Sequence, residues 1–195
     1  MKAIRIHTPG PLTTVQDLGR FHYFHLGVPV SGSLDDYAHR VANWLVGNPA
    51  RCAVLELSLM GGRLEFMCPA DIAVTGAMMP PRLNGSPFPT WRAWRVKAGD
   101  ILELGMAQEG CRAYLAVTGG IDVPEVMGSR ATFVGGRLGG FEGRPLAPGD
   151  VLSRSDRPLL TRPRRLAWRP IYPGTITLRA VPGPHAEFFQ AHLED

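Results

Sequence analysis

The sequence of 195 residues contains no long apolar run and few cysteines. None of its apolar stretches approaches the ~20 residues that a membrane-crossing helix needs, so we expect no membrane association. The charged start, Met1-Lys2-Ala3-Ile4-Arg5, lacks the apolar core of a signal peptide. Three cysteines (Cys52, Cys68 and Cys111), an odd number without a CxxC pair, indicate neither a disulfide framework nor a zinc ribbon. We therefore expect a cytoplasmic protein.

Signatures of common nucleotide and hydrolase sites are also missing. The sequence holds no GxxxxGK[ST] phosphate loop, no GxGxxG and no GxSxG elbow. The glycine-rich segment 135–144, GGRLGGFEGR, lacks the lysine and the hydroxyl residue that hold phosphate and magnesium. His22 and His25 lie three residues apart, but a third ligand at a typical spacing is missing, so we expect no metal site.

Lysine is nearly absent. Lys2 and Lys97 are the two lysines among 21 basic side chains, and the formal net charge is +4. The arginine guanidinium is a planar fork that suits carboxylates and phosphates, although such a bias also arises from genome composition. The small positive excess does not by itself predict a nucleic-acid binder, and we expect no nucleic-acid partner.

Glycine and proline are abundant, and they are spread along the whole chain. The 23 glycines and 18 prolines predict many turns between short elements, as in a β-rich fold. Apolar residues alternate with a period of two, which predicts strands, in the segments RLEFM (63–67), DILELG (100–105), CRAYLAVTGG (111–120) and TITLRAV (175–181). The segments 97–100 and 147–150 each precede a strand and read as tight turns.

One helix is strongly indicated, at about residues 33–46. Ser33 is a plausible N-cap, and acidic residues favour the positive first turn. Leu34, Ala38, Val41 and Leu45 recur at spacings of three and four, which is typical of an amphipathic helix. Gly47 is placed to end the helix in the left-handed conformation, and a proline follows two residues later.

The second half of the chain changes character after residue 153. Residues 154–170 are rich in arginine and proline without clean periodicity, and we interpret them as a linker that crosses the surface. A new strand and the opening of another helix follow. The expected organisation is a β lobe at 1–153, the linker at 154–170, and the start of an incomplete second lobe at 171–195.

Isolated polar residues pinned by glycines are the candidates for chemistry. Asp17 and Arg20 are close enough in a turn to pair, and a pinned arginine suits a carboxylate. Ser31 can donate a hydrogen bond or cap the helix. Asp35 at the helix start can act as a base, but a first-turn acid also has a structural reason. Asn43 is a poor helix former in mid-helix, which indicates a hydrogen-bonding duty in a structural network or in a site.

Six segments follow one another in the order of a known family. They are TTVQDLGR, GVPVSGSLDDYAHRVANWLVGN, AVLELSLMGGRLEF, IAVTGA, YLAVTGGIDVPEVMGSRAT and GRPLAPGDVL, and together they span nearly the whole chain. They resemble the allophanate hydrolase subunit 2 family, also called the biotin-dependent carboxyltransferase family. Its members include the C-type subunit of 5-oxoprolinase, the KipA-type antagonists of a kinase inhibitor, and part of the urea carboxylase carboxyltransferase domain.

The resemblance implies a mainly β fold, namely a cyclophilin-like β-barrel with one prominent helix and short additional helices. It also implies a complex with a B-type protein (allophanate hydrolase subunit 1 or KipI-like) and an A-type subunit, acting on a small amide. As a 5-oxoprolinase, that complex would hydrolyse 5-oxoproline to glutamate. ATP would act at the level of the complex, because phosphorylating the lactam oxygen turns a poor electrophile into a better one.

Other functions stay open at this point. An alternative that the resemblance leaves open is a carboxyltransferase-type domain of a biotin-dependent urea or amide carboxylase, for which biotin is the cofactor. It also resembles a KipA-like regulatory binding protein without catalysis. Family members usually run well beyond this length, so a chain truncated to the N-terminal portion is expected to be inactive alone.

The residues that match the family motifs are carried over as site predictions. Relatives usually have glycine at the place of His22 and methionine at the place of Leu34. Four positions are predicted to be catalytic: Asp17, Arg20, Ser31 and Asp35. Six are predicted to bind substrate: Asn43, Gly76, Gly119, Gly120, Ser129 and Arg130.

Overall fold

The computed structural model describes residues 1–168, 170, 175–181, 183–185 and 188. These residues form short strands, one α-helix and one 3-10 helix. The elements are β1 (Lys2–Thr8), β2 (Leu12–Gln16), η1 (Phe24–Leu26), α1 (Asp36–Leu45), β3 (Val54–Ser58), β4 (Arg63–Phe66), β5 (Ala70–Met78), β6 (Pro81–Leu83), β7 (Ser86–Pro87), β8 (Trp94–Val96), β9 (Ile101–Leu104), β10 (Glu109–Val117), β11 (Ile121–Asp122) and β12 (Val151–Arg154).

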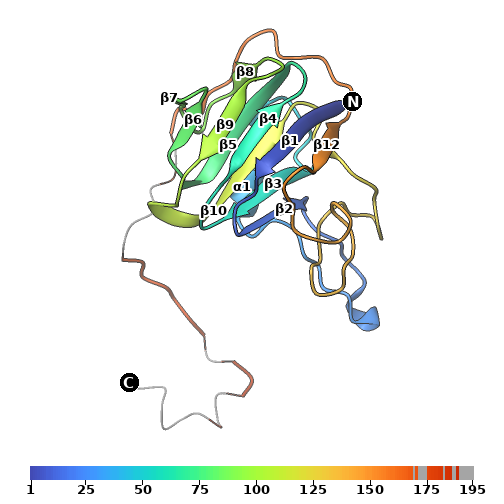
Figure 1. The fold of residues 1–195 in the computed structure, drawn as a ribbon. Coiled ribbons are helices and arrows are strands. Elements are labelled where there is room, and N and C mark those ends of the chain that lie inside the picture. Colours follow the sequence, from blue (N-terminus) through green and yellow to red (C-terminus); the bar gives the residue numbers. More distant parts are fainter. Residues whose placement is uncertain (169, 171–174, 182, 186–187, 189–195) are drawn as a thin grey trace.

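The strands build two antiparallel sheets (Figure 1). One sheet has the order β11-β12-β1-β4-β9-β6-β7 and the other β2-β3-β10-β5-β8. The predicted mainly β class with a single prominent helix is confirmed. The barrel is not, because within the described part of the chain the two sheets remain separate and do not close on each other.

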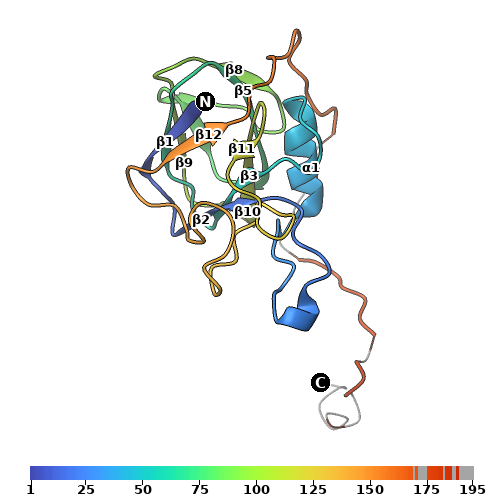
Figure 2. The ribbon, with the colours of Figure 1, turned by 90° about the vertical axis from the view of Figure 1, so that its right-hand side faces the viewer.

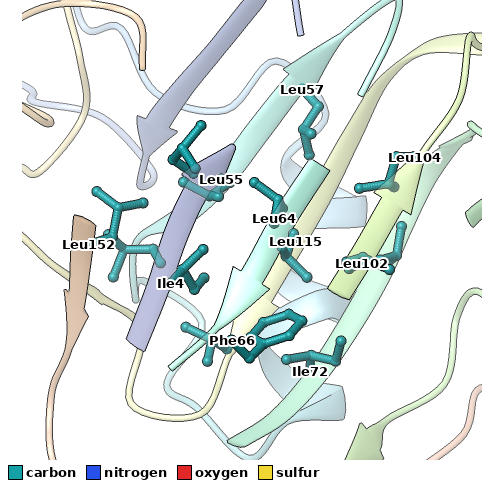
Figure 3. Packing of buried hydrophobic residues seen from close by; sticks show 14 of the residues in the cluster. Ile4, Leu55, Leu57, Leu64, Phe66, Ile72, Leu102, Leu104, Leu115 and Leu152 are labelled. Atoms are coloured by element: carbon teal, nitrogen blue, oxygen red, sulfur yellow. The ribbon is translucent and has the colours of Figure 1, made fainter. Parts of the chain in front are cut away.

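The main core fills the space between the two sheets (Figure 3). Leucine, isoleucine, valine and phenylalanine side chains from both sheets meet there and are almost fully buried. On β10 the period of two is observed: Ala113, Leu115 and Val117 face this core, while Tyr114 and Ala116 face the other side. Burying an aliphatic side chain contributes about 1.5–3 kcal/mol, so this alternation fixes which face of β10 points inward.

Helix α1 covers the outer face of the second sheet (Figure 2). Ala38, Ala42 and Leu45 are buried there against β5 and β10. The helix is shorter than predicted, 36–45, and Ser33 is not its N-cap. Asp35 caps it instead, since its carboxylate accepts from Ala38 N at 2.9 Å. The predicted end is confirmed: Gly47 is left-handed, with φ of 77°.

The arginine-rich segment after β12 lies against the edge strand β8 and the end of the helix. Leu160 N donates to the Asp71 carboxylate at 2.6 Å, and Ala93 N donates to the Arg164 carbonyl at 2.8 Å. The Arg164 guanidinium donates to the Trp44 carbonyl at 2.7 Å. These hydrogen bonds hold the segment at several points, and its role as a linker between two lobes stays a prediction.

The predicted strand at 175–181 is wrong. These residues have no strand conformation, and Ile176, Leu178 and Val181 are exposed. A strand needs a neighbouring strand to satisfy its backbone groups, and 175–181 pair with neither sheet. The remainder of the predicted second lobe at 171–195, including the helix opening, lies largely outside the described residues.

Candidate functional site

A cavity of about 870 Å³ opens beside the start of α1. Four segments build it: the loop after β2, the first turn of α1, the turn at 49–52, and the loop at 125–130. In Figure 2 the loop after β2 projects with η1 from the end of the sheets, on the side where α1 lies. The polar side chains that line the cavity are Asp17, His22, Tyr23, Ser33, Asp36, Arg40, Arg51, Cys52, Glu125 and Arg130.

Asp17 links two walls of this cavity. Its Oδ1 accepts from Gly19 N at 2.8 Å and from Ser129 Oγ at 2.6 Å, and its Oδ2 accepts from Arg130 N at 2.6 Å. Three of the predicted site residues, Asp17, Ser129 and Arg130, are therefore brought together. Because the carboxylate is already held by three donors, its evident task is to join the loop after β2 to the loop at 125–130.

Arg20 does not pair with Asp17 as predicted. It is 1% exposed, and its guanidinium donates to the carbonyl oxygens of Ala131 and Val126. Burial lowers the pKa of Arg20, and the charge of Asp17 opposes that shift. Its position behind the cavity wall makes Arg20 a support for the loop at 125–131, and it is not among the lining residues.

Ser31 lies where the loop doubles back on itself. Arg20 N donates to the Val30 carbonyl at 2.8 Å, so the two arms of the loop run side by side. A side chain at Gly19 would meet the Ser31 carbonyl at 2.8 Å, and Ser31 itself has a positive φ of 55°. The glycine is needed at this close approach. Ser31 shapes the loop but does not line the cavity.

The beginning of α1 rests on two polar residues of the sheet. Asp35 N donates to Tyr114 Oη at 2.7 Å, and Leu34 N donates to Glu56 Oε2 at 2.9 Å. The Tyr114 hydroxyl donates to the same Glu56 oxygen at 2.9 Å, and burial raises the pKa of Tyr114 well above its ordinary value. Asp35, predicted to be catalytic, serves here as the helix cap.

Asn43 belongs to a buried amide chain. Its Nδ2 donates to the Cys52 carbonyl at 2.8 Å, and its Oδ1 accepts from Asn48 Nδ2 at 3.0 Å. Asn48 Oδ1 in turn accepts from Gly119 N at 2.8 Å. A side chain at Gly120 would meet Cys52 Cβ at 2.9 Å. Asn43, Gly119 and Gly120 thus hold the turn at 49–52, which forms one wall of the cavity.

Gly76 lies apart from the site. It sits within β5 with φ of +81°, where an added side chain would collide with the Arg112 carbonyl of the neighbouring strand. Close backbone approach explains this glycine, and it does not line the cavity.

Sequence reasoning missed several residues that the fold brings to the cavity. Arg40 and Arg51 line it, and Arg51 is exposed and has no salt bridge within the described part of the chain. Ser33 and His39 were also overlooked: Ser33 Oγ and His39 Nδ1 lie 2.7 Å apart. The sequence does carry a signal, since a histidine occupies the buried stripe of an amphipathic helix.

Over the residues that the structure describes, three or more His, Cys, Asp or Glu side chains do not gather in any one place suited to a metal ion. The glycine-rich segment 135–144 is used for internal packing, because side chains at Gly139 and Gly140 would collide with Ala131 and Thr132. Among the described residues, helices long and apolar enough to cross a membrane are also absent.

The fold and site define a two-sheet antiparallel β domain that holds a polar cavity between loops at one end. The model of the carboxyltransferase domain, subdomain A and B, matches residues 26–195, so the chain belongs to this carboxyltransferase family. The chain is 46% identical to urea amidolyase of Lachancea kluyveri, in a match that covers 77% of this chain. It is 40% identical to the C-type subunit of 5-oxoprolinase from Escherichia coli, in a match that covers 98% of this chain. The crystal structure of TTHA0988 superposes with a TM-score of 0.90, 34% identity and full coverage of this chain.

The chain is shorter than each of these relatives. It spans 8% of the urea amidolyase, 61% of the 5-oxoprolinase C-type subunit and 39% of the TTHA0988 chain. The shared region is thus found both in a subunit of moderate length and inside very long polypeptides.

Proposed function

We propose that this chain is a component of an ATP-dependent 5-oxoprolinase similar to the C-type subunit, acting with A-type and B-type partner subunits. The supporting observation is the 40% identity to the C-type subunit of E. coli 5-oxoprolinase, which extends over 98% of this chain. The proposal includes a cytoplasmic location and keeps the cyclophilin-like architecture as a prediction.

The cavity is suited to a small anionic amide. 5-Oxoproline carries one carboxylate and one lactam carbonyl, and 870 Å³ is ample for it together with a partner's side chains. Arg51 is the group we assign to the carboxylate, because Arg40 and Arg130 are engaged by Asp36 and Glu125 at 2.5 and 2.6 Å. The proposal assigns nucleotide binding to the partner subunits, because this sequence holds no GxxxxGK[ST] phosphate loop.

Co-expression with A-type and B-type subunits from the same source tests this role. We expect ATP hydrolysis that depends on 5-oxoproline and on the presence of this chain. Arg51→Ala should raise the KM for 5-oxoproline about tenfold, the loss of one charged hydrogen bond, with kcat little changed. Arg82→Ala in the distant β6–β7 hairpin is the matched control. If all partners are soluble and full length, absence of 5-oxoproline-dependent turnover refutes the proposal.

A second candidate is a carboxyltransferase-type domain of a biotin-dependent urea or amide carboxylase. The 46% identity to urea amidolyase favours it, over the shorter span of 151 residues. This function needs a biotin carrier and a biotin carboxylase in the same complex. Urea-dependent ATP turnover with those partners, and none with 5-oxoproline, would select it. Tight binding to a B-type partner with neither activity would select the KipA-like regulatory role.

A further inference from the structure

A serine and a histidine form a close pair at the wall of the cavity. Ser33 lies just before α1 and lines the cavity, while His39 stands one turn into the helix and is 0% exposed. Ser33 Oγ lies 2.7 Å from His39 Nδ1. Ser33 N donates to the Asp17 carbonyl at 2.9 Å, which fixes the serine backbone to the loop after β2. Ser33 thus lines the cavity, and its hydroxyl is within hydrogen-bond distance of the buried imidazole.

The surroundings of His39 determine which ring nitrogen carries the proton. Nε2 lies 3.0 Å from the Ala50 carbonyl, and a carbonyl oxygen only accepts hydrogen bonds. Asn43 Nδ2, a donor, also lies 3.1 Å from Nε2, but its two N–H groups have acceptors in the Cys52 and Ala50 carbonyls, at 2.8 and 3.4 Å. We therefore assign the ring proton to Nε2, which donates it to the Ala50 carbonyl. The lone pair of Nδ1 is then left to accept from the Ser33 hydroxyl, which is the arrangement a general base requires.

Burial also keeps the imidazole neutral. It lowers the pKa of His39, while the hydrogen bond to the Ala50 carbonyl and the charges of Asp17 and Asp36 oppose this shift and Arg40 adds to it. The Tyr114 ring packs edge-on against the imidazole, with 6.3 Å between ring centroids. At neutral pH the imidazole is thus free to take a proton from the serine.

We propose that Ser33 is a nucleophile, activated by His39, that accepts an acyl group from a small carboxylate-bearing ester or other activated acyl compound. The Oγ–acyl bond forms while the bond from acyl carbon to leaving group breaks. The Ser33 proton passes to His39 Nδ1 and from there to the leaving group, and water later releases the acid with His39 again as base. Arg51 follows Ala50 in the turn that holds His39, and it provides the positive charge for the carboxylate.

This activity goes beyond the proposed function, because it needs neither ATP nor a partner subunit. It is tested with the full chain alone, using mono(4-nitrophenyl) succinate as the anionic probe and 4-nitrophenyl acetate as the neutral one. Release of 4-nitrophenolate gives the rate, and peptide mass mapping locates the acyl group. Circular dichroism of every variant confirms folding.

We expect the succinyl group on Ser33 and faster acylation by the anionic ester. Ser33→Ala should abolish that adduct, and His39→Gln should slow it about 100-fold, the usual worth of a general base. Arg51→Ala should lower the ratio of the acylation rates for the anionic and the neutral ester about tenfold. Ser86→Ala, in the exposed β7, should leave the rate unchanged. In the unaltered protein the rate should fall on acidification with a midpoint below the ordinary histidine range.

Some outcomes would overturn the proposal. If Ser33 stays unlabelled, or if the His39→Gln variant is acylated at the full rate, the Ser33 hydroxyl serves only as a hydrogen-bond partner for a buried histidine. The pH profile tests the same point, since a rate that falls on acidification over the same range in the unaltered chain and in His39→Gln excludes the imidazole as the titrating base. Labelling of Ser33 without 5-oxoprolinase activity in the complex would refute the proposed function alone.

Discussion

Replacing Asp17 by Asn tests the link between the two loops that wall the cavity. Asp17 Oδ1 holds Gly19 N and Ser129 Oγ, and Oδ2 holds Arg130 N at 2.6 Å. An Asn amide keeps an oxygen for the first two donors but turns its own N–H group toward the Arg130 N–H. A hydrogen bond to a charged group contributes about 1.5–3 kcal/mol, and a buried donor left unpaired costs about 1–3 kcal/mol. We expect Asp17→Asn to lower the free energy of unfolding by about 3 kcal/mol.

Urea denaturation, followed by circular dichroism and tryptophan fluorescence, measures this loss. Ser129→Ala removes one of the three donors and should cost about 1 kcal/mol. Asp156→Asn changes the same charge at an exposed position and should stay within about 0.5 kcal/mol of the unaltered protein. If Asp17→Asn loses less than about 1 kcal/mol, the carboxylate does not join the loops in the way the hydrogen bonds indicate.

Three further predictions concern packing and pH. Gly140→Ala places a methyl group against Thr132 Oγ1 at a positive φ of 56° and should cost about 2–4 kcal/mol, whereas Gly149→Ala, with open space, should cost about 1–2 kcal/mol. The pKa of His39 is lowered by burial, so stability should fall as pH drops below the ordinary histidine value, and His39→Gln should flatten this slope. The Arg144 guanidinium lowers the pKa of Asp150. The stability that this pair contributes is therefore present above the ordinary carboxyl pKa and is lost as the pH falls through the pKa of the folded state. Asp150→Asn should remove that acid-induced loss and cost about 1 kcal/mol at pH 7.

Thermal and urea unfolding at several pH values check all three. Equal losses for Gly140→Ala and Gly149→Ala would show that the contact with Thr132 relaxes without cost. A His39→Gln variant whose stability depends on pH as steeply as the unaltered protein would assign that slope to other groups. If an Asp150→Asn variant still loses stability over the same acidic range, that loss comes from groups other than the Arg144–Asp150 pair.

Some elements could be predicted because they depend only on residues close together in the sequence. The period of two in β10 and the end of α1 at Gly47 are of this kind. The start of α1 was misplaced because Ser33 and Asp35 are both good caps. Ser33 turns to His39 instead, which is buried only because the helix packs on the sheet.

Long-range partners account for the other differences. The sequence suggested that Arg20 pairs with Asp17, three residues away, but the acceptors of Arg20 come from residues 126 and 131. The alternation in 175–181 resembles that of a strand, yet a strand forms only where another offers its backbone groups. Arg51 lies outside the six family segments, and Ser33 lies within one of them but has the sequence signal of a helix cap. Their relation is visible only once the turn at 49–52 meets the helix start.

The sequence by itself determined the β class, the single helix and the family. Apolar alternation, capping residues and the order of motifs can be recognised along the chain without knowledge of which distant residues meet. Only the tertiary structure decided what the polar residues do. Asp17, Asn43 and Gly119 hold segments together by hydrogen bonds. Ser33 and Arg51 line the cavity, and His39 is buried beside Ser33. The reason is physical: the energy of a buried polar group depends on the donors and acceptors around it, and those arrive from distant parts of the chain.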